Sequence, residues 1–547
     1  MTLKTPVLIV GAGPVGLALA GELGWRGISC CLVEKGDGSI YQPKMDLVGV
    51  RTMEFCRRWG IVKWVEEAPY PRDLRQDNVY VSSVAGYEFG REPMPAMDGD
   101  KPPPQSPQHR ERCPQDMFDP VLRRFAQSFP HVNLRYHAEL QSFEDRGTGV
   151  VARIIDARTG APETIEADYL VGCDGAASTV RQSLGIEMAG NPVLTYTTNV
   201  IFRCENFLSL HDKGEAYRYI VIGPEGTWST IVAINGVDRY RFSIVGDENK
   251  RTYDEDEVRA LIFKAVGREF PCEILTIVPW IRRELVADSY GRGRVFIAGD
   301  AAHLTSPTGA FGMNMGIQDA VDLGWKLAAL AKGWGGAKLV PAAYEIERRP
   351  VAIRNVREAS ANLRRMLSPR SEKLRHEAFV PGAAGDAARA EFGAWFSEQM
   401  RHEWYTLGIH LGYRYEGSPL VVPDGTPEPP DTVNTYEQTA RPGHRAPHVW
   451  LGDGKSTLDL FGRGFVLLRF SRTADASALD RAARAAHVPL AVVDIEHEGA
   501  ARLYGRALVL VRPDGHVAWR GDTVPADASR IIETVRGAGR PEPTPAR

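Results

Sequence analysis

The sequence predicts an α/β protein in which a Rossmann-like nucleotide-binding domain is interrupted by a separate β-sheet and followed by a third α/β domain. Three observations predict this fold. A strand, a glycine turn and a helix open the chain, and a second strand–turn–helix junction lies near residue 300. Between these two junctions, short strands alternate with Gly, Asp and Pro turns. At 547 residues the chain exceeds a single hydrophobic core, so two or three domains are expected.

The composition is that of a globular protein, with 43% hydrophobic and 25% charged residues. No apolar stretch approaches the roughly 20 residues of a membrane span. Residues 1–11 are too short and too strand-like for a signal peptide, so we expect a cytoplasmic protein without membrane contact. Lys and Arg number 66 against 69 acidic residues, a net charge of −3 that does not favour nucleic acid. A small neutral or weakly acidic ligand fits this charge better.

The seven cysteines form neither a CxxC pair nor a His/Cys cluster at metal-binding spacing. Their odd number and apolar settings indicate reduced thiols that pack in the interior. We therefore expect neither a disulfide framework nor a metal site.

The first glycine turn has the spacing of a dinucleotide-binding motif. It follows an apolar strand over 6–10 and opens a helix over 17–23, so unpaired N–H groups at the helix start can meet a pyrophosphate. A second strand over 28–33 leads to Glu34, about twenty residues beyond the glycines, where a carboxylate can accept hydrogen bonds from ribose hydroxyls. This combination predicts an ADP-containing dinucleotide without choosing between FAD and NAD. The residues expected to contact it at the turn are Gly11, Gly13, Pro14, Val15 and Gly16.

The remaining elements follow from apolar spacing and turn residues. A helix is predicted over 115–128, and the strand over 168–174 ends at Asp174 before a glycine turn into another helix. In the middle region, Tyr217 and Tyr219 would project to one face of a strand. The other predicted strands are 132–136, 149–157, 197–203, 217–222, 228–234, 240–245 and 295–298, and the later helices are 313–327 and 339–366.

The proline-rich stretch over 421–447 indicates a linker before the last domain. Strands are predicted beyond it over 465–470, 490–493, 507–511 and 517–520, with a helix over 476–486. The expected domains are a discontinuous nucleotide-binding domain (1–185 and 286–375), a substrate-binding sheet (186–285), a helical segment with the linker (376–440), and the C-terminal domain (441–547).

Three motifs in this order resemble the single-component FAD-dependent aromatic hydroxylases, the para-hydroxybenzoate and phenol hydroxylase family. They are Gly-Ala-Gly-Pro-Val-Gly at 11–16, Cys-Asp-Gly-Ala-Ala-Ser-Thr-Val-Arg at 173–181, and Ala-Gly-Asp-Ala-Ala-His at 298–303 with Pro-Thr-Gly-Ala-Phe-Gly-Met-Asn-Met-Gly at 307–316. The resemblance covers the whole chain, since Arg-Pro-Gly-His-Arg-Ala-Pro-His at 441–448 is similar to the start of that family's thioredoxin-like C-terminal domain. This domain contains no cysteine, which excludes thioredoxin chemistry and leaves structural support or a homodimer contact.

The resemblance implies FAD as cofactor, with NADH or NADPH and O2 as co-substrates. It places Glu34 on the adenosine ribose and Asp300 on the ribityl chain. The backbone N–H groups of Met313 and Asn314 would face the flavin N1/C2 carbonyl and stabilise negative charge on the reduced flavin. Asp174 belongs to the second dinucleotide fingerprint. The other residues expected at the cofactor are Lys35, Lys44, Arg51, Gln115, Pro307 and Gly312.

In this family NAD(P)H reduces FAD, oxygen adds at flavin C4a, and the hydroperoxide transfers oxygen to an activated ring, which requires a dry pocket and a base. Asp46 is the candidate base, because related phenol hydroxylases carry an Asp at this distance before Arg-Thr-Leu/Met-Glu. The alternative interpretation is that Asp46 caps a helix beginning near Val48. Tyr217, Tyr219 and the carbonyl of Pro307 are the further catalytic candidates, with sheet packing or a simple turn as their alternatives.

The leading hypothesis is a monooxygenase that hydroxylates a small aromatic substrate, a substituted phenol or catechol, with loss of a nitro or halogen substituent left open. One alternative is a Baeyer–Villiger-type or polyketide-tailoring flavin monooxygenase. A different class of alternative is a non-catalytic flavin-binding redox sensor, which would share the glycines but need no base.

Overall fold

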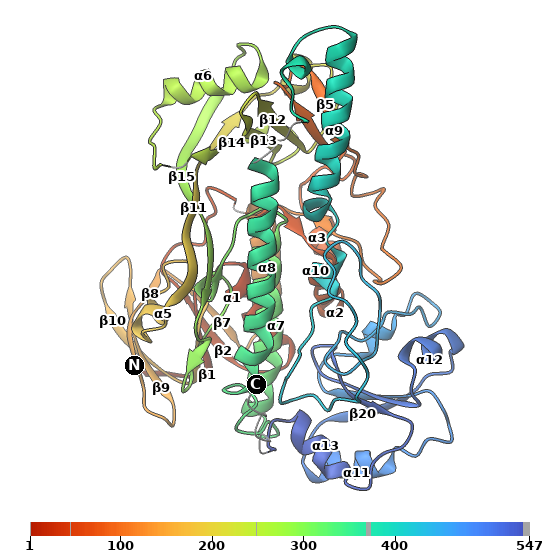
Figure 1. The fold of residues 1–547 in the computed structure, drawn as a ribbon. Coiled ribbons are helices and arrows are strands. Elements are labelled where there is room, and N and C mark those ends of the chain that lie inside the picture. The colour runs from red at the N-terminus through yellow and green to blue at the C-terminus, as the bar shows by residue number, and fades with distance from the viewer. Residues whose placement is uncertain (1, 44, 248, 368–372, 540–547) are drawn as a thin grey trace.

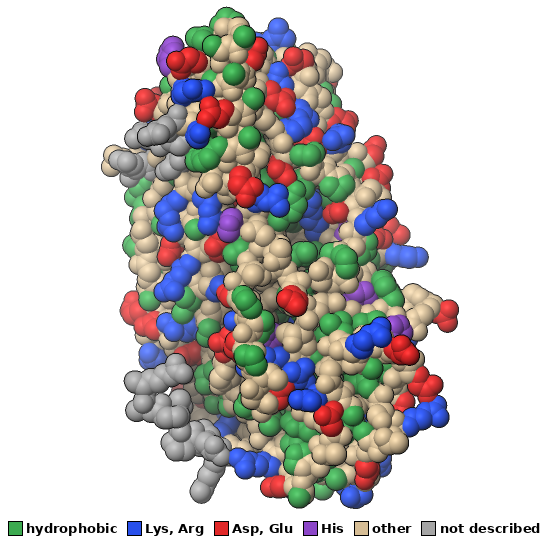
Figure 2. Space-filling model, turned by 45° about the vertical axis from the view of Figure 1, so that its right-hand side comes forward, with side chains coloured by type: hydrophobic (Ala, Val, Ile, Leu, Met, Phe, Trp, Pro, Cys, Tyr) green, Lys and Arg blue, Asp and Glu red, His purple; other side chains and the backbone are tan. Residues whose placement is uncertain are grey.

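The computed structural model describes residues 2–43, 45–247, 249–367 and 373–539. Figure 1 shows two large sheets connected along the length of the molecule by helix α8 (Ala343–Leu367), with a separate C-terminal α/β unit beside the first sheet. None of the described helices is long and apolar enough to cross a membrane. On the face shown in Figure 2, positive and negative side chains are interspersed, in keeping with the small net charge.

The first sheet has a parallel core formed by segments that are far apart in the sequence. Its strand order is β16-β17-β10-β1-β2-β7, with β8 and β9 attached to β10. Strand β17 pairs in parallel with β10, so the chain returns to this sheet after it has formed most strands of the second sheet. The strands are β1 (Thr2–Val10), β2 (Cys30–Glu34), β7 (Val132–Tyr136), β8 (Ala138–Asp145), β9 (Val150–Asp156), β10 (Pro162–Gly172), β16 (Gly291–Arg292) and β17 (Val295–Ile297).

Helices pack against this sheet, and the central parallel strands are therefore buried. Val7, Leu8 and Ile9 of β1 are fully buried. Helix α1 packs against both α4 and α7. The helices of this part are α1 (Pro14–Trp25), α2 (Val50–Trp59), α3 (Val62–Glu66), α4 (Gln115–Gln127), α5 (Thr179–Ser183), α7 (Phe311–Ala331) and α8 (Ala343–Leu367), and a short ladder joins β3 (Leu47–Val48) to β6 (Glu111–Arg112).

The second sheet has the order β18-β15-β11-β14-β13-β12-β4-β5. Five of its strands come from the interval expected to form the substrate sheet, and three are added from outside that interval. Strand β15 was not among the predicted strands, because Pro279 and two adjacent arginines obscure its alternation. The strands are β4 (Asn78–Val81), β5 (Glu88–Glu92), β11 (Met188–Arg203), β12 (Arg218–Gly223), β13 (Gly226–Ala233), β14 (Arg239–Asp247), β15 (Glu273–Ala287) and β18 (His303–Leu304), with α6 (Glu255–Val266) and α9 (Ala383–Trp404) beside them. The short helix α10 (Leu407–Leu411) packs against α2.

The C-terminal unit is a four-stranded sheet in the order β20-β19-β21-β22. Only the β19–β20 pair is parallel, and the other two pairs are antiparallel. All seven cysteines are free and lie before this unit. Its elements are β19 (Phe465–Arg469), α11 (Ser477–Ala485), β20 (Leu490–Asp494), α12 (Glu498–Tyr504), β21 (Leu508–Val511), β22 (Val517–Gly521) and α13 (Ala528–Val535).

Candidate active site

The first glycine turn leaves the start of helix α1 open to a ligand. Gly11 has a φ of +105°, and a Cβ there would lie 2.4 Å from the carbonyl oxygen of Cys173, so no other residue fits. Gly13 is the N-cap of α1 and no side chain caps the helix. A Cβ on Gly13 would meet nothing within 4 Å. The turn therefore presents uncapped N–H groups beside open space, which is the environment that a pyrophosphate requires.

The two glycine motifs that are far apart in the sequence meet in the structure. Pro14 is the first residue of α1, and Val15 follows it with a buried side chain. A Cβ on Gly299 would lie 2.8 Å from Cγ2 of Val15, and a Cβ on Gly316 would lie 2.5 Å from the same atom. The close approach of α1, the end of β17 and helix α7 depends on these small residues.

Glu34 closes the other side of the turn. Its carboxylate accepts hydrogen bonds from the backbone N–H of Ala12 (2.9 Å) and of Gly36 (2.8 Å). These bonds fix the carboxylate at the end of β2, where it retains acceptor capacity for a ribose. Lys35 is exposed directly after it. Lys44, the other predicted lysine, lies outside the described residues.

Asn314 ties the start of α7 to the segment that carries Asp46. Its Oδ1 accepts hydrogen bonds from the N–H of Gly49 (2.8 Å) and the hydroxyl of Thr52 (2.7 Å), and its Nδ2 donates to the carbonyl of Leu47 (3.0 Å). No side chain caps α7, whose N-cap is Ala310. The predicted backbone N–H groups thus lie at an open helix start, while the bridging role of the Asn314 side chain was not predicted.

The neighbouring loop residues are accessible. Asp300 is exposed in a single 3₁₀ turn over 299–301 directly after β17. Pro307 is also exposed, and its carbonyl accepts a hydrogen bond from the N–H of Ala310 (3.1 Å) within the loop. Gly312 and Met313 are partly buried. His303 is buried and hydrogen-bonded to Asp319 at 2.7 Å, as expected for a packed residue.

Two of the predicted cofactor residues serve local structure. Both carboxylate oxygens of Asp174 are used at the start of α5, where Oδ1 accepts from the hydroxyl of Ser178 (2.5 Å) and Oδ2 from the N–H of Val180 (3.1 Å). The N–H of Gln115 donates to the carbonyl of Met45 (3.0 Å), and its side chain donates to Asp119 (3.2 Å). Gln115 therefore holds the segment that carries Asp46 against the start of α4.

The prediction that Arg51 contacts the cofactor needs correction. Its guanidinium is buried and donates to Glu54 (2.7 Å), to the hydroxyl of Tyr413 (3.2 Å) and to the carbonyl of Asp514 (2.9 Å) in the C-terminal unit. Arg445, also from the C-terminal unit, pairs with the same Glu54. Each of the three donor nitrogens has a protein partner, so Arg51 holds the C-terminal unit on α2 instead.

Asp46 is held by side chains from three separate segments. Its Oδ1 accepts a hydrogen bond from Arg112 (2.8 Å), and its Oδ2 accepts one from the Tyr217 hydroxyl (2.5 Å). Arg241 approaches Oδ2 at 3.4 Å. Helix α2 begins only at Val50, and its N-cap is Gly49 without any side-chain cap. The alternative interpretation of Asp46 as a helix cap is therefore wrong.

The surrounding charges keep Asp46 ionised. Burial raises the pKa of Asp46, but the charges of Arg112 and Arg241 and the hydrogen bond from Tyr217 outweigh it and hold the pKa below its usual value. Burial raises the pKa of the Tyr217 hydroxyl well above its usual range, so this group remains a donor. The guanidinium carbon of Arg112 lies 3.6 Å from the centre of the Tyr217 ring. The three side chains form one stacked and hydrogen-bonded unit.

Tyr219 is not part of this unit. Its hydroxyl donates to the carbonyl of Gly214 (3.0 Å), and its ring packs near those of Phe207 and His211. Among the described residues, no hydrogen bond connects Tyr219 to Asp46. The structure thus separates the two predicted tyrosines, and packing accounts for Tyr219.

Further charged residues of the site come from positions that no motif indicates. Arg218 donates to Glu403 of α9 at 2.7 Å, and Arg282 of β15 donates to the hydroxyls of Thr197 (2.9 Å) and Ser306 (3.2 Å). Arg218 and Arg241 both act electrostatically on Asp46. The only local signal in the sequence is arginine within otherwise apolar strands.

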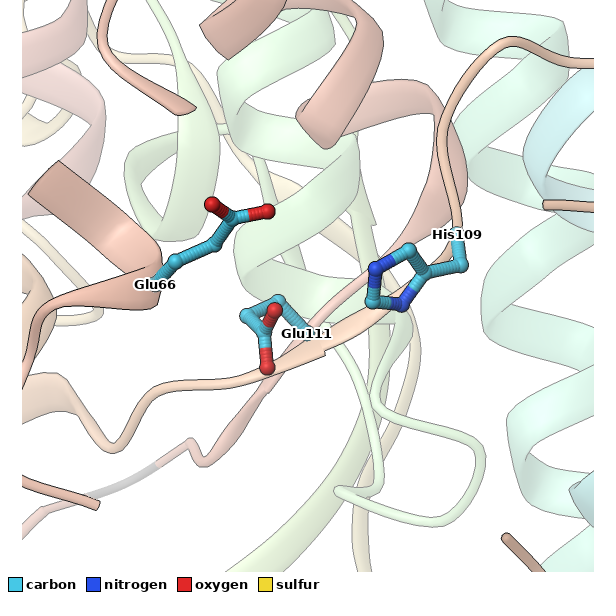
Figure 3. A group of neighbouring side chains, drawn as sticks. All are labelled: Glu66, His109 and Glu111. Atoms are coloured by element: carbon cyan, nitrogen blue, oxygen red, sulfur yellow. The ribbon is translucent and has the colours of Figure 1, made fainter. Parts of the chain in front are cut away.

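A separate group of possible metal ligands forms only on folding. One ligand atom each of Glu66, His109 and Glu111 lie within 4.8 Å of one another (Figure 3). Nδ1 of His109 is buried without a hydrogen-bond partner. However, Glu111 accepts a hydrogen bond from Arg72 at 2.5 Å, which places a positive charge where a cation would bind. The cluster fits a metal poorly.

Comparison with known proteins identifies the family. Residues 4–359 match the FAD binding domain family, and residues 439–539 match the C-terminal domain of aromatic-ring hydroxylases. The chain belongs to the FAD-binding aromatic-ring hydroxylases. The predicted α/β fold with an FAD-binding domain and a C-terminal α/β domain is confirmed, and the C-terminal domain matches that of the aromatic-ring hydroxylases. The open α1 start, the fixed Glu34 and the uncapped α7 start fit FAD.

The relatives of this hydroxylase include a rebeccamycin biosynthetic enzyme, a putative polyketide hydroxylase and a nitrocatechol monooxygenase. The structure of the rebeccamycin biosynthetic enzyme RebC with reduced flavin is 40% identical, with a TM-score of 0.91 over 98% of this chain and 100% of RebC. A putative polyketide hydroxylase of Streptomyces halstedii is 34% identical over 98% of both chains. The 4-methyl-5-nitrocatechol 5-monooxygenase of a Burkholderia species is 31% identical over 97% of this chain and 96% of the relative. The relatives do not single out the phenol hydroxylase subgroup.

Proposed function

We propose that this hydroxylase uses NADH or NADPH and O2 to hydroxylate a phenolic ring held beside Asp46. The observation that carries the proposal is the position of the Asp46 carboxylate, which contacts Tyr217 and Arg112 on a segment that Asn314 fastens to the start of α7. An ionised acid is thereby fixed next to the helix start where the flavin ring would lie. A redox sensor needs no such arrangement.

When bound, FAD supplies the redox chemistry that passes two electrons from the nicotinamide to O2. The balance is one substrate, one NAD(P)H, one proton and one O2 giving hydroxylated product, NAD(P)+ and water. Gly11, Gly13 and Gly16 would receive the pyrophosphate and Glu34 the adenosine ribose. The N–H groups of Met313 and Asn314 would hold the flavin ring edge, and Asp300 the ribityl chain.

The side chains around Asp46 would activate the ring in two ways. Arg112 and Arg241 stabilise a phenolate electrostatically, which lowers the barrier to losing the phenolic proton. A carboxylate oxygen of Asp46 receives that proton, and Tyr217 orients the carboxylate through its hydrogen bond. The low pKa of Asp46 makes it a weak base, so the neighbouring arginines have to supply part of the activation.

The test is Asp46→Asn in the FAD-loaded protein, assayed with NADH and NADPH against phenols, catechols, nitrophenols and hydroxyphenylpropionates. We expect NAD(P)H oxidation to continue while hydroxylated product falls at least about 100-fold, as measured by mass spectrometry and oxygen uptake. Tyr219→Phe is the matched control. Unchanged product formation by the Asp46 variant at every pH would contradict the assignment.

A second candidate function is oxygen insertion or hydroxylation on a polyketide. The similarity to the putative polyketide hydroxylase of Streptomyces halstedii favours it. An assay on a polyketide that carries a ketone tests this candidate. Oxygen insertion and ring hydroxylation both add one oxygen atom and give products of equal mass, so fragmentation has to distinguish an ester or lactone from a ring hydroxyl. A nitrophenol that is hydroxylated at the substituted carbon would release nitrite, which a colorimetric assay detects.

A further inference from the structure

Two cysteines face each other where the long antiparallel pair of β11 and β15 ends, next to helix α6 (Figure 1). The last pair of this ladder joins Arg203 to Glu273, and the pair before it has the same register. The next pair in that register is Cys204 with Cys272. Residues directly opposite each other in an antiparallel pair project to the same face of the sheet. The fold therefore brings together two thiols that are far apart in the sequence.

The backbone hydrogen bonds show which kind of pair these cysteines form. The N–H of Cys204 donates to the carbonyl of Asp238 (2.8 Å), which lies on the β14 side of β11. The carbonyl of Cys272 accepts a hydrogen bond from the side chain of Arg259 (2.8 Å). Neither group is directed at the opposite strand, as in a non-hydrogen-bonded pair, where the Cα atoms lie about 4.5 Å apart. A disulfide requires a Cα separation of about 4.4 to 6.8 Å, so the backbone suits one as it stands.

The two thiols share one apolar cluster and differ in their access to solvent. Cys204 is a buried member of this cluster, and Cys272 packs against it. Cys272 is also one of the groups that act electrostatically on the Cys204 thiol, in keeping with their proximity. Among the cysteines, all of which the structure describes, only Cys272 is partly exposed. A small oxidant from solvent therefore meets Cys272 first.

A guanidinium group lies beside the sulfur of Cys272. Nη1 of Arg259 is 3.7 Å from Sγ, and Nη2 pairs with Glu255 at 2.6 Å. Burial raises the pKa of the Cys272 thiol, Arg259 opposes this effect, and Glu255 adds to it. Burial also raises the pKa of Cys204. Since the thiolate is the reactive form, the pair reacts slowly at neutral pH and rests as two free thiols.

We infer that Cys204 and Cys272 are a site of reversible oxidation, at which hydrogen peroxide joins the two sulfurs in a disulfide within the folded protein. The inference goes beyond the proposed function and does not depend on it. The chain between the two cysteines contains Tyr217 and Arg241, which contact Asp46. Oxidation would therefore close a loop around the part of the second sheet that completes the Asp46 unit, and would restrict its conformational freedom.

The reaction has two steps and consumes one peroxide. The Cys272 thiolate attacks one peroxide oxygen, so that an S–O bond forms, the O–O bond breaks, and the departing hydroxide takes up a proton as water. The sulfur of Cys204 then attacks the sulfenic acid, so that the S–S bond forms, the S–O bond breaks, and a second water leaves. Two thiols and one hydrogen peroxide thus give one disulfide and two waters. The sulfurs lose two electrons, and the peroxide gains them.

The experiment treats the folded, FAD-loaded protein with hydrogen peroxide at mildly alkaline pH, alkylates the remaining thiols under denaturing conditions, and digests the protein with trypsin without reductant. We expect a linked pair of the tryptic peptides 204–213 and 269–282, with a mass about 2 Da below the sum of the two. Dithiothreitol should separate them. The other five of the seven cysteines should remain alkylated.

Variants distinguish this pair from unspecific oxidation. Cys272→Ala should abolish the linked peptides, and Cys204→Ala should leave a sulfenic acid at Cys272 that dimedone traps. Arg259→Gln should slow the linkage about threefold or more, because it removes the charge that favours the thiolate. Cys56→Ala is the matched control, since it removes a buried thiol of α2 and should leave the yield of linked peptides unchanged.

The natural protein alone can overturn the inference, so a variant that fails to fold does not decide the matter. The inference is wrong if peroxide leaves both thiols free, or if it oxidises Cys272 to a sulfinic acid without any linkage to Cys204. It is also wrong if the linked peptides contain other cysteines in equal yield. An equal loss of linkage in Cys56→Ala and Cys272→Ala would exclude a specific pair as well.

Discussion

The hydroxyl of Tyr217 donates a 2.5 Å hydrogen bond to Oδ2 of Asp46, although the two residues are 171 positions apart in the chain. Arg112 stacks on the Tyr217 ring and donates to the other carboxylate oxygen. The Tyr217–Asp46 hydrogen bond thus connects the first domain, which carries Asp46, to the second sheet. A change at Tyr217 should therefore alter the chemistry of Asp46 directly.

Tyr217→Phe should raise the pKa of Asp46, because the hydrogen bond from Tyr217 is one of the interactions that hold this pKa below its usual value. If ionised Asp46 accepts the proton, activity is lost as the pH falls through this pKa. The acidic limb of the product-formation profile should then move to higher pH, with a fall of about tenfold or more in the plateau. Tyr219→Phe should leave the profile unmoved. An acidic limb that stays in place in Tyr217→Phe would exclude the coupling.

Gly13→Ala should fold normally but bind FAD weakly. The φ of Gly13 is −72°, and a methyl there would meet no protein atom within 4 Å, so the apoprotein should not be strained. The methyl would occupy the open space that we assign to the pyrophosphate. Thermal unfolding of the apoprotein should be unchanged, while flavin retention on gel filtration falls by at least about tenfold. Retention equal to that of the natural protein would show that the space is not the cofactor's.

Asn314→Ala should destabilise the segment that carries Asp46 and should also weaken FAD binding. It leaves the N–H of Gly49, the hydroxyl of Thr52 and the carbonyl of Leu47 without their partner, at a cost of about 3 kcal/mol in the free energy of unfolding. We expect a lower Tm and faster FAD release. The release is measured by the increase in flavin fluorescence. The control is Asn434→Ala, which removes two side-chain hydrogen bonds to backbone carbonyls at the end of α9, away from the Asp46 segment. Equal flavin release from the two variants would argue against a specific role.

Glu54→Gln should test the contact between the C-terminal unit and α2. Burial raises the pKa of Glu54, but Arg445 and Arg51 outweigh it and hold the folded-state pKa below 4.5. Its contribution to stability is therefore complete above pH 4.5 and is lost as the pH falls through the lower folded-state value. We expect the free energy of unfolding to fall by about 3 kcal/mol at pH 7. The Tm of the variant should also decrease less on acidification than the Tm of the natural protein. Glu498→Gln, at an exposed pair, should change neither quantity.

The local motifs were sufficient to predict the elements to which we assign the cofactor. The glycine turn, Glu34 and the helix after residue 310 depend on residues that are adjacent in sequence, so spacing alone predicts their arrangement. Arg282 and Glu403 could not be found this way, because their neighbours come from other strands and from α9. Arg51 misled the interpretation since it follows Asp46 closely in sequence, yet the first turn of α2 directs it to the C-terminal unit.

The two carboxylate oxygens of Glu54 connect helix α2, through Arg51, to Arg445 of the C-terminal unit. The same helix starts at the turn that Asn314 binds. A chimaera that exchanges the C-terminal unit with that of a relative would therefore disturb the interior of the other half unless α2 is exchanged with it. For recombination during evolution, and for shuffling in the laboratory, the natural crossover unit includes α2 as well as the last hundred or so residues.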